Sequence, residues 1–129
     1  MTVTEIDEGY KPLTAVQVEE KLRQAVRDLE AATDAYSAAC DQAAEAEYQW
    51  KLAEAKTIVS NTGRPVSASE RHAKVDHQDY YHFYKVSAGV RDAALERVRS
   101  ARGVLSAVQT AAGSFRDQFS AANQAGWGA

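Results

Sequence analysis

The sequence predicts an all-α fold, a long antiparallel helical hairpin of coiled-coil type that oligomerises. The 129 residues include only two prolines and seven glycines, which suits long helices. Small and apolar residues recur three and four positions apart over most of the chain, and the period-two alternation of a strand is missing. One short segment of turn residues, 61–67, separates two long periodic segments, so we expect two helices packed in opposite directions.

The first helix is predicted to span residues 14–60. Thr14 is the expected N-cap, and Gln17, three positions later, completes a capping box. No proline or glycine interrupts the segment before Gly63. Its small and apolar residues form a heptad seam, which predicts one buried stripe. The seam consists of Ala15, Val18, Leu22, Ala25, Leu29, Ala32, Tyr36, Ala39, Ala43, Ala46, Trp50 and Ala53.

The second helix is predicted to span residues 68–120. Asn61 and Gly63 suit the end of the first helix because both tolerate left-handed backbone geometry. Ser67 is the expected N-cap of the second helix, with Glu70 returning to it in a second capping box. The seam of the second helix consists of Phe83, Ser87, Val90, Ala94, Val98 or Arg97, Ala101, Leu105, Val108, Ala112, Phe115 and Phe119.

The two ends are predicted to be flexible, as an acidic arm over residues 1–13 and a tail over residues 121–129. The first residues contain no apolar segment typical of a signal peptide, and no apolar run approaches the ~20 residues that span a membrane. Cys40 is the only cysteine, so a disulfide framework is absent. These features predict a cytoplasmic protein, in the host cell cytoplasm if a phage encodes it.

Residues 80–84 read YYHFY and place four aromatic rings in five positions. Such a run covers more than one full helical turn, so a single contact with the first helix cannot bury it all. Antiparallel pairing about the turn sets Tyr48 and Trp50 beside residues 78–81. One side of the aromatic run is therefore expected to pack on the first helix, and another subunit or a ligand is expected to cover the rest.

Self-association is expected because two helices alone bury only one stripe each and make a poor core. The predicted partner is another copy of the chain, in a dimer or a larger bundle. The residues predicted at the oligomer interface are Tyr48, Trp50, Tyr80, Phe83, Val90 and Leu105.

A second candidate partner is single-stranded DNA. Residues 1–60 carry 12 acidic against 6 basic side chains, whereas residues 61–129 carry 6 acidic against 9 basic ones. Aromatic rings beside a track of cations are the physical requirement for binding single strands. The predicted nucleic-acid contacts are Arg64, Arg71, Lys74, Tyr81, Tyr84, Lys85 and Arg91. On composition alone a different interpretation is favoured, in which the aromatic run forms a subunit interface and the arginines pair with acids of the first helix.

Catalysis and metal binding are not expected. The chain contains none of the motifs GxSxG, GxxxxGK[ST] or HExxH. His72, Asp76, Asp79 and His82 lie along one helical stripe, but the Glu-x-x-His pairs of carboxylate metal sites in bundles do not occur. The stripe is therefore interpreted as a solvated surface with local His–Asp pairs. We predict a protein that is not an enzyme and has no cofactor, no metal, no membrane contact and no small-molecule substrate.

Three stretches carry a resemblance to a known group of proteins: EYQWKLAEAK, GRPVSASERHAKV and ERVRSARGVLSAVQT. In their pattern, residues 35–110 resemble the small helical recombination-mediator proteins of tailed phages. The resemblance implies a helical, ring-like oligomer that loads a recombinase on single-stranded DNA. The leading expectation is thus a non-enzymatic phage accessory protein of single-strand DNA recombination, an oligomeric mediator whose partners are single-stranded DNA and a recombinase or annealing protein.

An alternative function follows from the residues alone. An oligomeric coiled-coil module for protein–protein interaction, such as a phage scaffold or a host-directed inhibitor, would use the same seams and the same aromatic run. Such a module would not bind nucleic acid. Binding of a labelled oligonucleotide separates the two hypotheses, because only a mediator binds with an affinity that falls steeply as salt rises.

Overall fold

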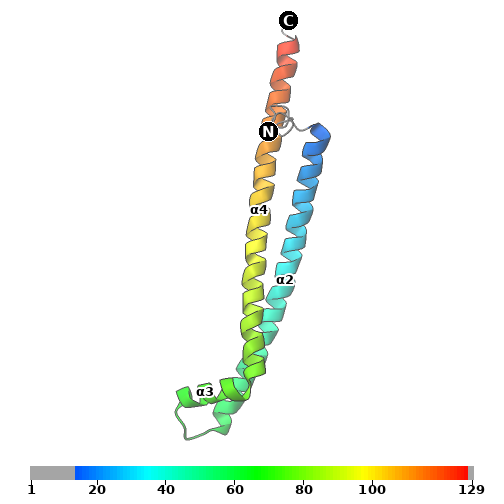
Figure 1. Cartoon of the computed structure of the whole chain (residues 1–129). Helices are drawn as coiled ribbons and strands as arrows, with labels where there is room; N and C mark the ends of the chain where they lie inside the picture. Colours follow the sequence, from blue (N-terminus) through cyan, green and yellow to red (C-terminus); the bar gives the residue numbers. More distant parts are fainter. Residues whose placement is uncertain (1–13, 128–129) are drawn as a thin grey trace, which may run out of the picture. The chain divides into compact units, whose positions relative to one another are not determined.

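The computed structural model of the chain describes residues 14–127, with side chains described up to residue 122. Every regular element in this range is an α-helix (Figure 1): α2 spans Ala15–Ser60, α3 spans Val66–Asp76 and α4 spans Gln78–Trp127. The all-α prediction is confirmed for residues 14–127. The predicted flexible arm, residues 1–13, lies outside the described residues.

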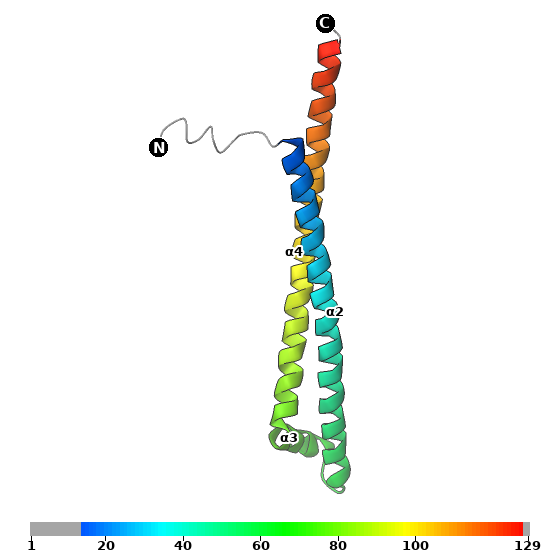
Figure 2. The same cartoon turned by 90° about the vertical axis from the view of Figure 1, so that its right-hand side faces the viewer.

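The chain divides into two compact units, one formed by residues 31–99 and the other by the residues before 31 and after 99. In residues 31–99, the α2 and α4 segments lie side by side and run in opposite directions, and α3 projects sideways near the end where they are connected (Figure 1, Figure 2). In the other unit, Val18 and Leu22 of α2 line a groove with Ala112 and Phe115 of α4. Each unit therefore pairs a segment of α2 with a segment of α4.

The seam predicted on α2 is confirmed by the burial of its central residues. The structure buries seven of them: Ala25, Ala32, Ala39, Ala43, Ala46, Trp50 and Ala53. Thr57 extends the buried stripe by one turn, and its hydroxyl donates a hydrogen bond to the carbonyl of Ala53 at 3.1 Å. Six of these seven side chains are single methyl groups, so the helix buries little large apolar surface along its seam.

The seam predicted on α4 is confirmed only in part. Ser87, Val98 and Ala112 are buried, but Phe83, Val90 and Phe119 are exposed, and placing these three in the seam was wrong. The partly buried positions early in α4 are instead Tyr81, Tyr84, Ala88, Arg91 and Leu95. The reason is that the four Tyr and Phe residues of positions 80–84 extend over nearly half of the helix circumference, so periodicity does not select which of them face α2.

The turn and the first cap form as predicted. The backbone N–H of Gln17 donates to the Thr14 hydroxyl at 3.2 Å, and the Thr14 N–H donates to the Gln17 side chain at 2.9 Å, which completes the capping box. After α2, the side-chain amide of Asn61 donates to the carbonyl of Thr57 at 2.7 Å. Gly63 has a φ of 100°, a left-handed conformation that favours glycine.

The second predicted cap was wrong. α3 begins at Val66, one residue before Ser67, and its N-cap is Pro65, which makes no side-chain cap hydrogen bond. The N–H groups of Ala68 and Ser69 both donate to the Pro65 carbonyl, at 3.1 and 3.2 Å. The fixed φ of proline starts the helix at this position, so Ser67 already lies inside the first turn.

The single helix predicted over residues 68–120 is corrected to two helices. The backbone leaves helical geometry at His77, with φ −120° and ψ 40°. Hydrogen bonds continue across the break, because His77 donates to Ala73 at 2.8 Å and Tyr81 donates to His77 at 3.0 Å. Lys74 in the last turn of α3 and Asp79 in the first turn of α4 each complement the helix dipole at the break.

The boundary predicted for the C-terminal tail is also corrected. α4 continues to Trp127, so residues 121–127 are helical and not a loose tail. Alanines and Gln124 favour continuation of a helix, and no proline occurs after Pro65 to end it. Residues 128 and 129 lie outside the described residues.

Candidate interaction surface

Trp50 and Tyr81 join α2 to α4 near the α3 end of residues 31–99. Their ring centroids are 5.0 Å apart with an angle of 61° between the ring planes, an edge-to-face contact. Trp50 is 2% exposed. The expected packing of Trp50 on residues 78–81 is confirmed, whereas Tyr48, expected beside it, is 63% exposed. Trp50 had been predicted at a subunit interface, and the structure places it in the interior of its own chain.

Two lysines lie over the ring of Tyr81. The Lys74 Nζ is 5.2 Å from the ring centroid and the Lys85 Nζ is 5.6 Å from it. The same Lys85 Nζ is 5.4 Å from the centroid of Tyr84. Four of the predicted nucleic-acid contacts are thus brought together: two rings and two ammonium groups within cation–π distance.

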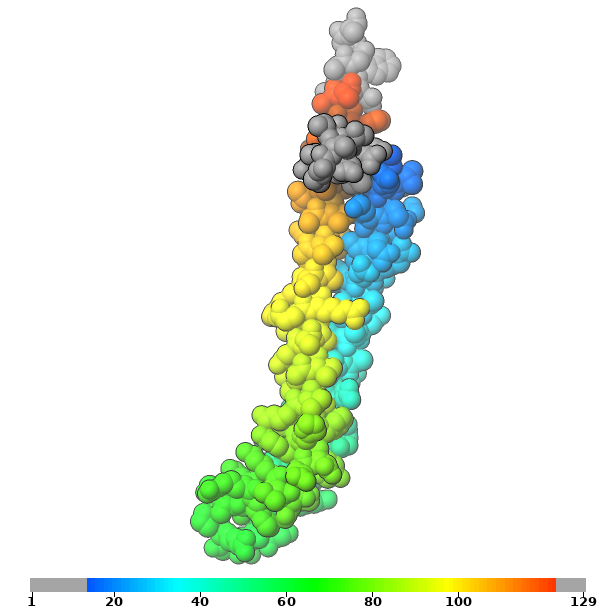
Figure 3. All heavy atoms as spheres, in the orientation of Figure 1, coloured from blue at the N-terminus to red at the C-terminus, as the bar shows by residue number. Residues whose placement is uncertain are grey.

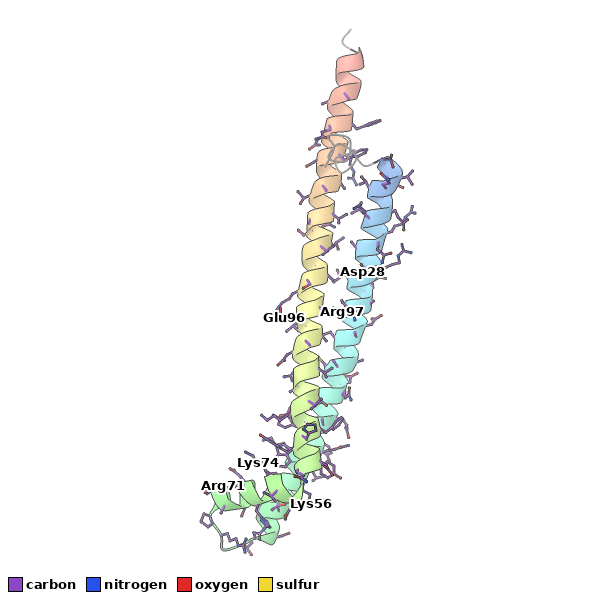
Figure 4. All side chains as sticks on the ribbon, in the orientation of Figure 1. Asp28, Lys56, Arg71, Lys74, Glu96 and Arg97 are labelled. Atoms are coloured by element: carbon purple, nitrogen blue, oxygen red, sulfur yellow. The ribbon has the colours of Figure 1, made fainter. Side chains whose placement is uncertain are left out.

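The other predicted cationic contacts have different surroundings. Arg91 is half-buried and pairs with the Asp92 carboxylate at 3.4 Å. Arg71 donates to the backbone carbonyl of Ser67 at 3.4 Å. Figure 4 shows Arg71 and Lys74 on α3, and Lys56 on the neighbouring end of α2. Among the described residues, no acid forms a salt bridge with the following cations: Arg64, Arg71, Lys74 and Lys85.

A set of exposed large apolar side chains lies in the same unit, and we call it the apolar face. It consists of Tyr48, Leu52 and Val59 on α2 and of Tyr80, Phe83, Val86 and Val90 on α4, which are between 38% and 72% exposed. The spacing of three, four or seven residues places each set on one side of its helix. Leu52 of the α2 stripe and Tyr80 of the α4 stripe line one hollow together with Lys56 and His77. Figure 3 shows that α3 and the first turns of α4 share one continuous surface at this end of the unit.

Four of the residues predicted at an oligomer interface lie on this face: Tyr48, Tyr80, Phe83 and Val90. Leu105 is half-buried and belongs to the other unit. Sequence reasoning missed Leu52, Val59 and Val86. The spacing of Tyr48, Leu52 and Val59 was a usable signal, because these residues repeat at helical intervals outside the alanine seam.

In the described part of the chain, more large hydrophobic side chains are exposed than are fully buried. Thirteen large hydrophobic side chains are exposed, whereas Trp50 and Val98 are the only large ones in the buried core, which is otherwise alanine. Soluble proteins bury most of their Val, Leu, Ile and Phe side chains. The described part of the chain therefore buries mostly methyl groups and leaves rings and branched side chains at its surface.

The polar stripe on α3 and α4 carries the local pair that was expected. His72 Nε2 lies 3.0 Å from the Asp76 carboxylate. Within the described residues, no group of three or more His, Cys, Asp or Glu side chains could hold a metal ion.

The phenol of Tyr36 on α2 has a pKa raised above its ordinary value. Its side-chain hydrogen bond with Cys40 raises the pKa of the phenol, and the charge of the Cys40 thiolate and desolvation act in the same direction. Arg91 and Arg99 of α4 oppose these effects and lower the pKa. Both arginines act on an α2 residue, which agrees with the antiparallel pairing fixed by Trp50 and Tyr81.

No family model, curated protein or solved structure matches this chain. None of the helices in the described residues is long and apolar enough to span a membrane. A functional interpretation therefore rests on the geometry of the surface itself.

Proposed function

We propose that this chain is a non-enzymatic, self-associating helical module for protein–protein interaction, and that the apolar face is its binding surface. The observation that supports this function is the exposure of seven large hydrophobic side chains on the apolar face, whereas Trp50 and Val98 are the only large ones that are fully buried in the described residues. Contiguous exposed apolar surface on a soluble protein marks an interaction site.

The composition of the apolar face suits a protein partner. Tyrosine and phenylalanine are enriched at the centres of protein interfaces, where they bury a large area at little cost in side-chain entropy. Tyr80 and Phe83 belong to this face and are carried by α4. Lys56 and Gln49 line the hollow beside Tyr80 and would form part of a polar rim. In this function the chain acts as the antiparallel hairpin expected from its sequence.

Sedimentation velocity over a wide range of protein concentrations tests the proposed function. Wild-type protein is expected to self-associate, and Phe83→Glu is expected to shift the equilibrium strongly to the monomer, because a carboxylate would be buried without a partner. His82→Glu introduces the same group one position away, off the apolar face, and is the matched control. Circular dichroism checks that both variants stay helical. A wild-type protein that remains monomeric throughout would refute the function.

A second candidate function, the single-strand DNA mediator, is favoured by one specific observation. Lys74 and Lys85 lie over the rings of Tyr81 and Tyr84, and neither lysine has an acidic partner among the described residues. The same geometry also weakens this candidate, since part of the Tyr81 ring already packs on Trp50 and is not free to stack on a base.

A labelled oligonucleotide tests the second function. Binding is expected to weaken steeply with rising salt, and Arg71→Glu combined with Lys74→Glu is expected to abolish it while helicity is kept. Absence of binding at low salt would eliminate the mediator and leave the interaction module. Phe83→Glu, off the cationic cluster, serves as the control that separates DNA contact from oligomerisation.

A further inference from the structure

We propose that two copies of this chain associate through α4 alone, in an antiparallel two-fold dimer in which the side of α4 that points away from α2 packs on the same side of the other copy's α4. This arrangement rests on the proposed function, because it specifies how the module self-associates. It is argued from one stripe of α4 residues within residues 31–99, which is complementary to itself in both size and charge.

α4 has a side that faces α2 and a second side that points away from it. The α2-facing side is identified by its buried and half-buried residues: Tyr81, Tyr84, Ser87, Ala88, Arg91, Leu95 and Val98. The other side carries six exposed residues, which we call the outer stripe: Asp79, Phe83, Val86, Val90, Ala93 and Arg97. At about 100° per residue, the outer stripe falls within an arc of about 80°, centred about 130° from the middle of the α2-facing side.

The outer stripe has the spacing of a coiled-coil seam. Its successive members are alternately four and three residues apart, as in a heptad repeat. Because all six are exposed, no part of the described chain covers them. An apolar seam at heptad spacing, with a charge at each end, is the surface that a partner helix covers.

The order of residues in the outer stripe is symmetric about the level of Ala88. A two-fold axis perpendicular to α4 at this level sets two copies of the stripe against each other in opposite directions. Residues at equal distances on either side of Ala88 then meet across the dimer, because both helices rise equally per residue. The pairs that meet are, from the ends of the stripe inward, Asp79 with Arg97, Phe83 with Ala93, and Val86 with Val90.

The charges at the ends of the stripe select this direction. Asp79 and Arg97 are both exposed, and within the described residues neither forms a salt bridge. They are eighteen residues apart on one helix, about 27 Å along its axis, so they cannot pair within one chain. The antiparallel dimer brings them together twice. A parallel dimer would instead place aspartate beside aspartate and arginine beside arginine, so charge complementarity favours the antiparallel arrangement.

The sizes of the apolar side chains fit the same direction. In the antiparallel dimer the ring of Phe83 meets the methyl group of the other copy's Ala93, and Val86 meets the other copy's Val90. A large side chain opposite a small one lets two helices interdigitate without a clash or a void. A parallel dimer would place the two Phe83 rings against each other and leave the two Ala93 methyl groups apart.

A charge-exchange experiment in sedimentation velocity tests this arrangement. Asp79→Arg alone and Arg97→Asp alone each place two like-charge pairs across the dimer, and each is expected to weaken self-association about tenfold. The double variant re-forms both pairs with their signs exchanged and keeps the wild-type net charge, so it is expected to associate nearly as tightly as wild type. Glu47→Arg, at an exposed acid of α2, makes the same change in net charge as Asp79→Arg and should leave association unchanged.

The double variant also separates contacts between protomers from effects within one helix. Asp79 lies in the first turn of α4, where it complements the helix dipole, and both variants with arginine at this position lose that effect. Recovery in the double variant therefore reports pairing across the dimer. If wild type associates but the single variants associate equally tightly, or the double variant stays as weak as they are, the antiparallel arrangement is overturned while the interaction module stands. If wild type is monomeric at every concentration, both the arrangement and the proposed function are overturned.

Discussion

The rings of Trp50 and Tyr81 meet edge to face at 5.0 Å, one from α2 and one from α4. This contact supplies the largest buried side chain in a core that is otherwise mostly alanine. Trp50 lies on the inside of this unit, whereas Tyr48 and Phe83 lie on its outside.

Trp50→Ala is expected to destabilise the protein by about 3–5 kcal/mol, because it removes the largest buried side chain and leaves a cavity that alanines cannot fill. Urea unfolding at one fixed protein concentration measures the loss. Val75→Ala, at a position of α3 that is 71% exposed, is the control and should change stability by less than about 0.5 kcal/mol. Similar losses in both variants would show that the contact with Tyr81 does not organise the core.

Ala46→Leu is expected to destabilise the protein by about 1–3 kcal/mol through overpacking, since Ala46 is 0% exposed and its surroundings leave no open side for a larger side chain. Ala44→Leu makes the same change two residues away on the exposed side of α2 and is expected to have little effect. Thermal unfolding of the two variants side by side measures the difference. A stabilising Ala46→Leu would mean that the alanine seam leaves room for larger side chains.

Two glycine substitutions are expected to act in opposite directions. Gly63 has a φ of 100°, and an added Cβ would meet no atom within 4 Å, so Gly63→Ala costs only backbone strain, about 1 kcal/mol. Gly89 lies in α4 with equally open space, so Gly89→Ala is expected to stabilise by up to about 1 kcal/mol through helix propensity. Urea unfolding measures the change in the free energy of unfolding for each variant, and so gives the sign of each effect. The same sign for both would contradict the left-handed turn at Gly63.

Cys40→Ala is expected to lower the pKa of Tyr36, because it removes the hydrogen bond and the thiolate charge that raise it. A tyrosine whose pKa is higher in the folded state contributes stability that is present below its unfolded pKa and is lost as the pH rises through the folded pKa. Ultraviolet titration of the phenols measures the shift, and Tyr36→Phe identifies which of the six tyrosines is responsible. An unchanged titration after Cys40→Ala would exclude the hydrogen bond.

Much of the fold could be predicted from the sequence where one periodic pattern dominates. On α2 the small and apolar residues of the seam keep their spacing throughout, and the structure buries seven of them between Ala25 and Ala53. Thr14 and Gln17 predicted the cap because their side chains can bond the free N–H groups of a helix start. Gly63 predicted the turn because glycine adopts a left-handed backbone conformation. Trp50 could be placed opposite residues 78–81 because the turn is short and fixes the pairing.

Other features of the fold and the site could not be predicted, because the residue pattern around them either favoured several structures or gave no indication of one. The four Tyr and Phe residues of positions 80–84 extend over nearly half of the helix circumference, and the spacing alone places Phe83 in the seam that Tyr81 and Tyr84 occupy. The break at His77 has no proline or glycine to mark it, and it arises from a single residue outside helical geometry. Leu52 and Tyr80 line one hollow because two helices pack together there. The spacing of residues along the sequence does not show how two helices pack.

Coverage of the apolar face by a second copy can be measured directly by the reactivity of a thiol on that face. In a Cys40→Ser background, Val90→Cys places a thiol on the apolar face, and Val75→Cys makes the same substitution at an exposed site of α3 away from it. The labelling rate at position 90 is predicted to fall as protein concentration rises, while the rate at position 75 stays constant. Equal, concentration-independent labelling at both positions would contradict self-association through the apolar face.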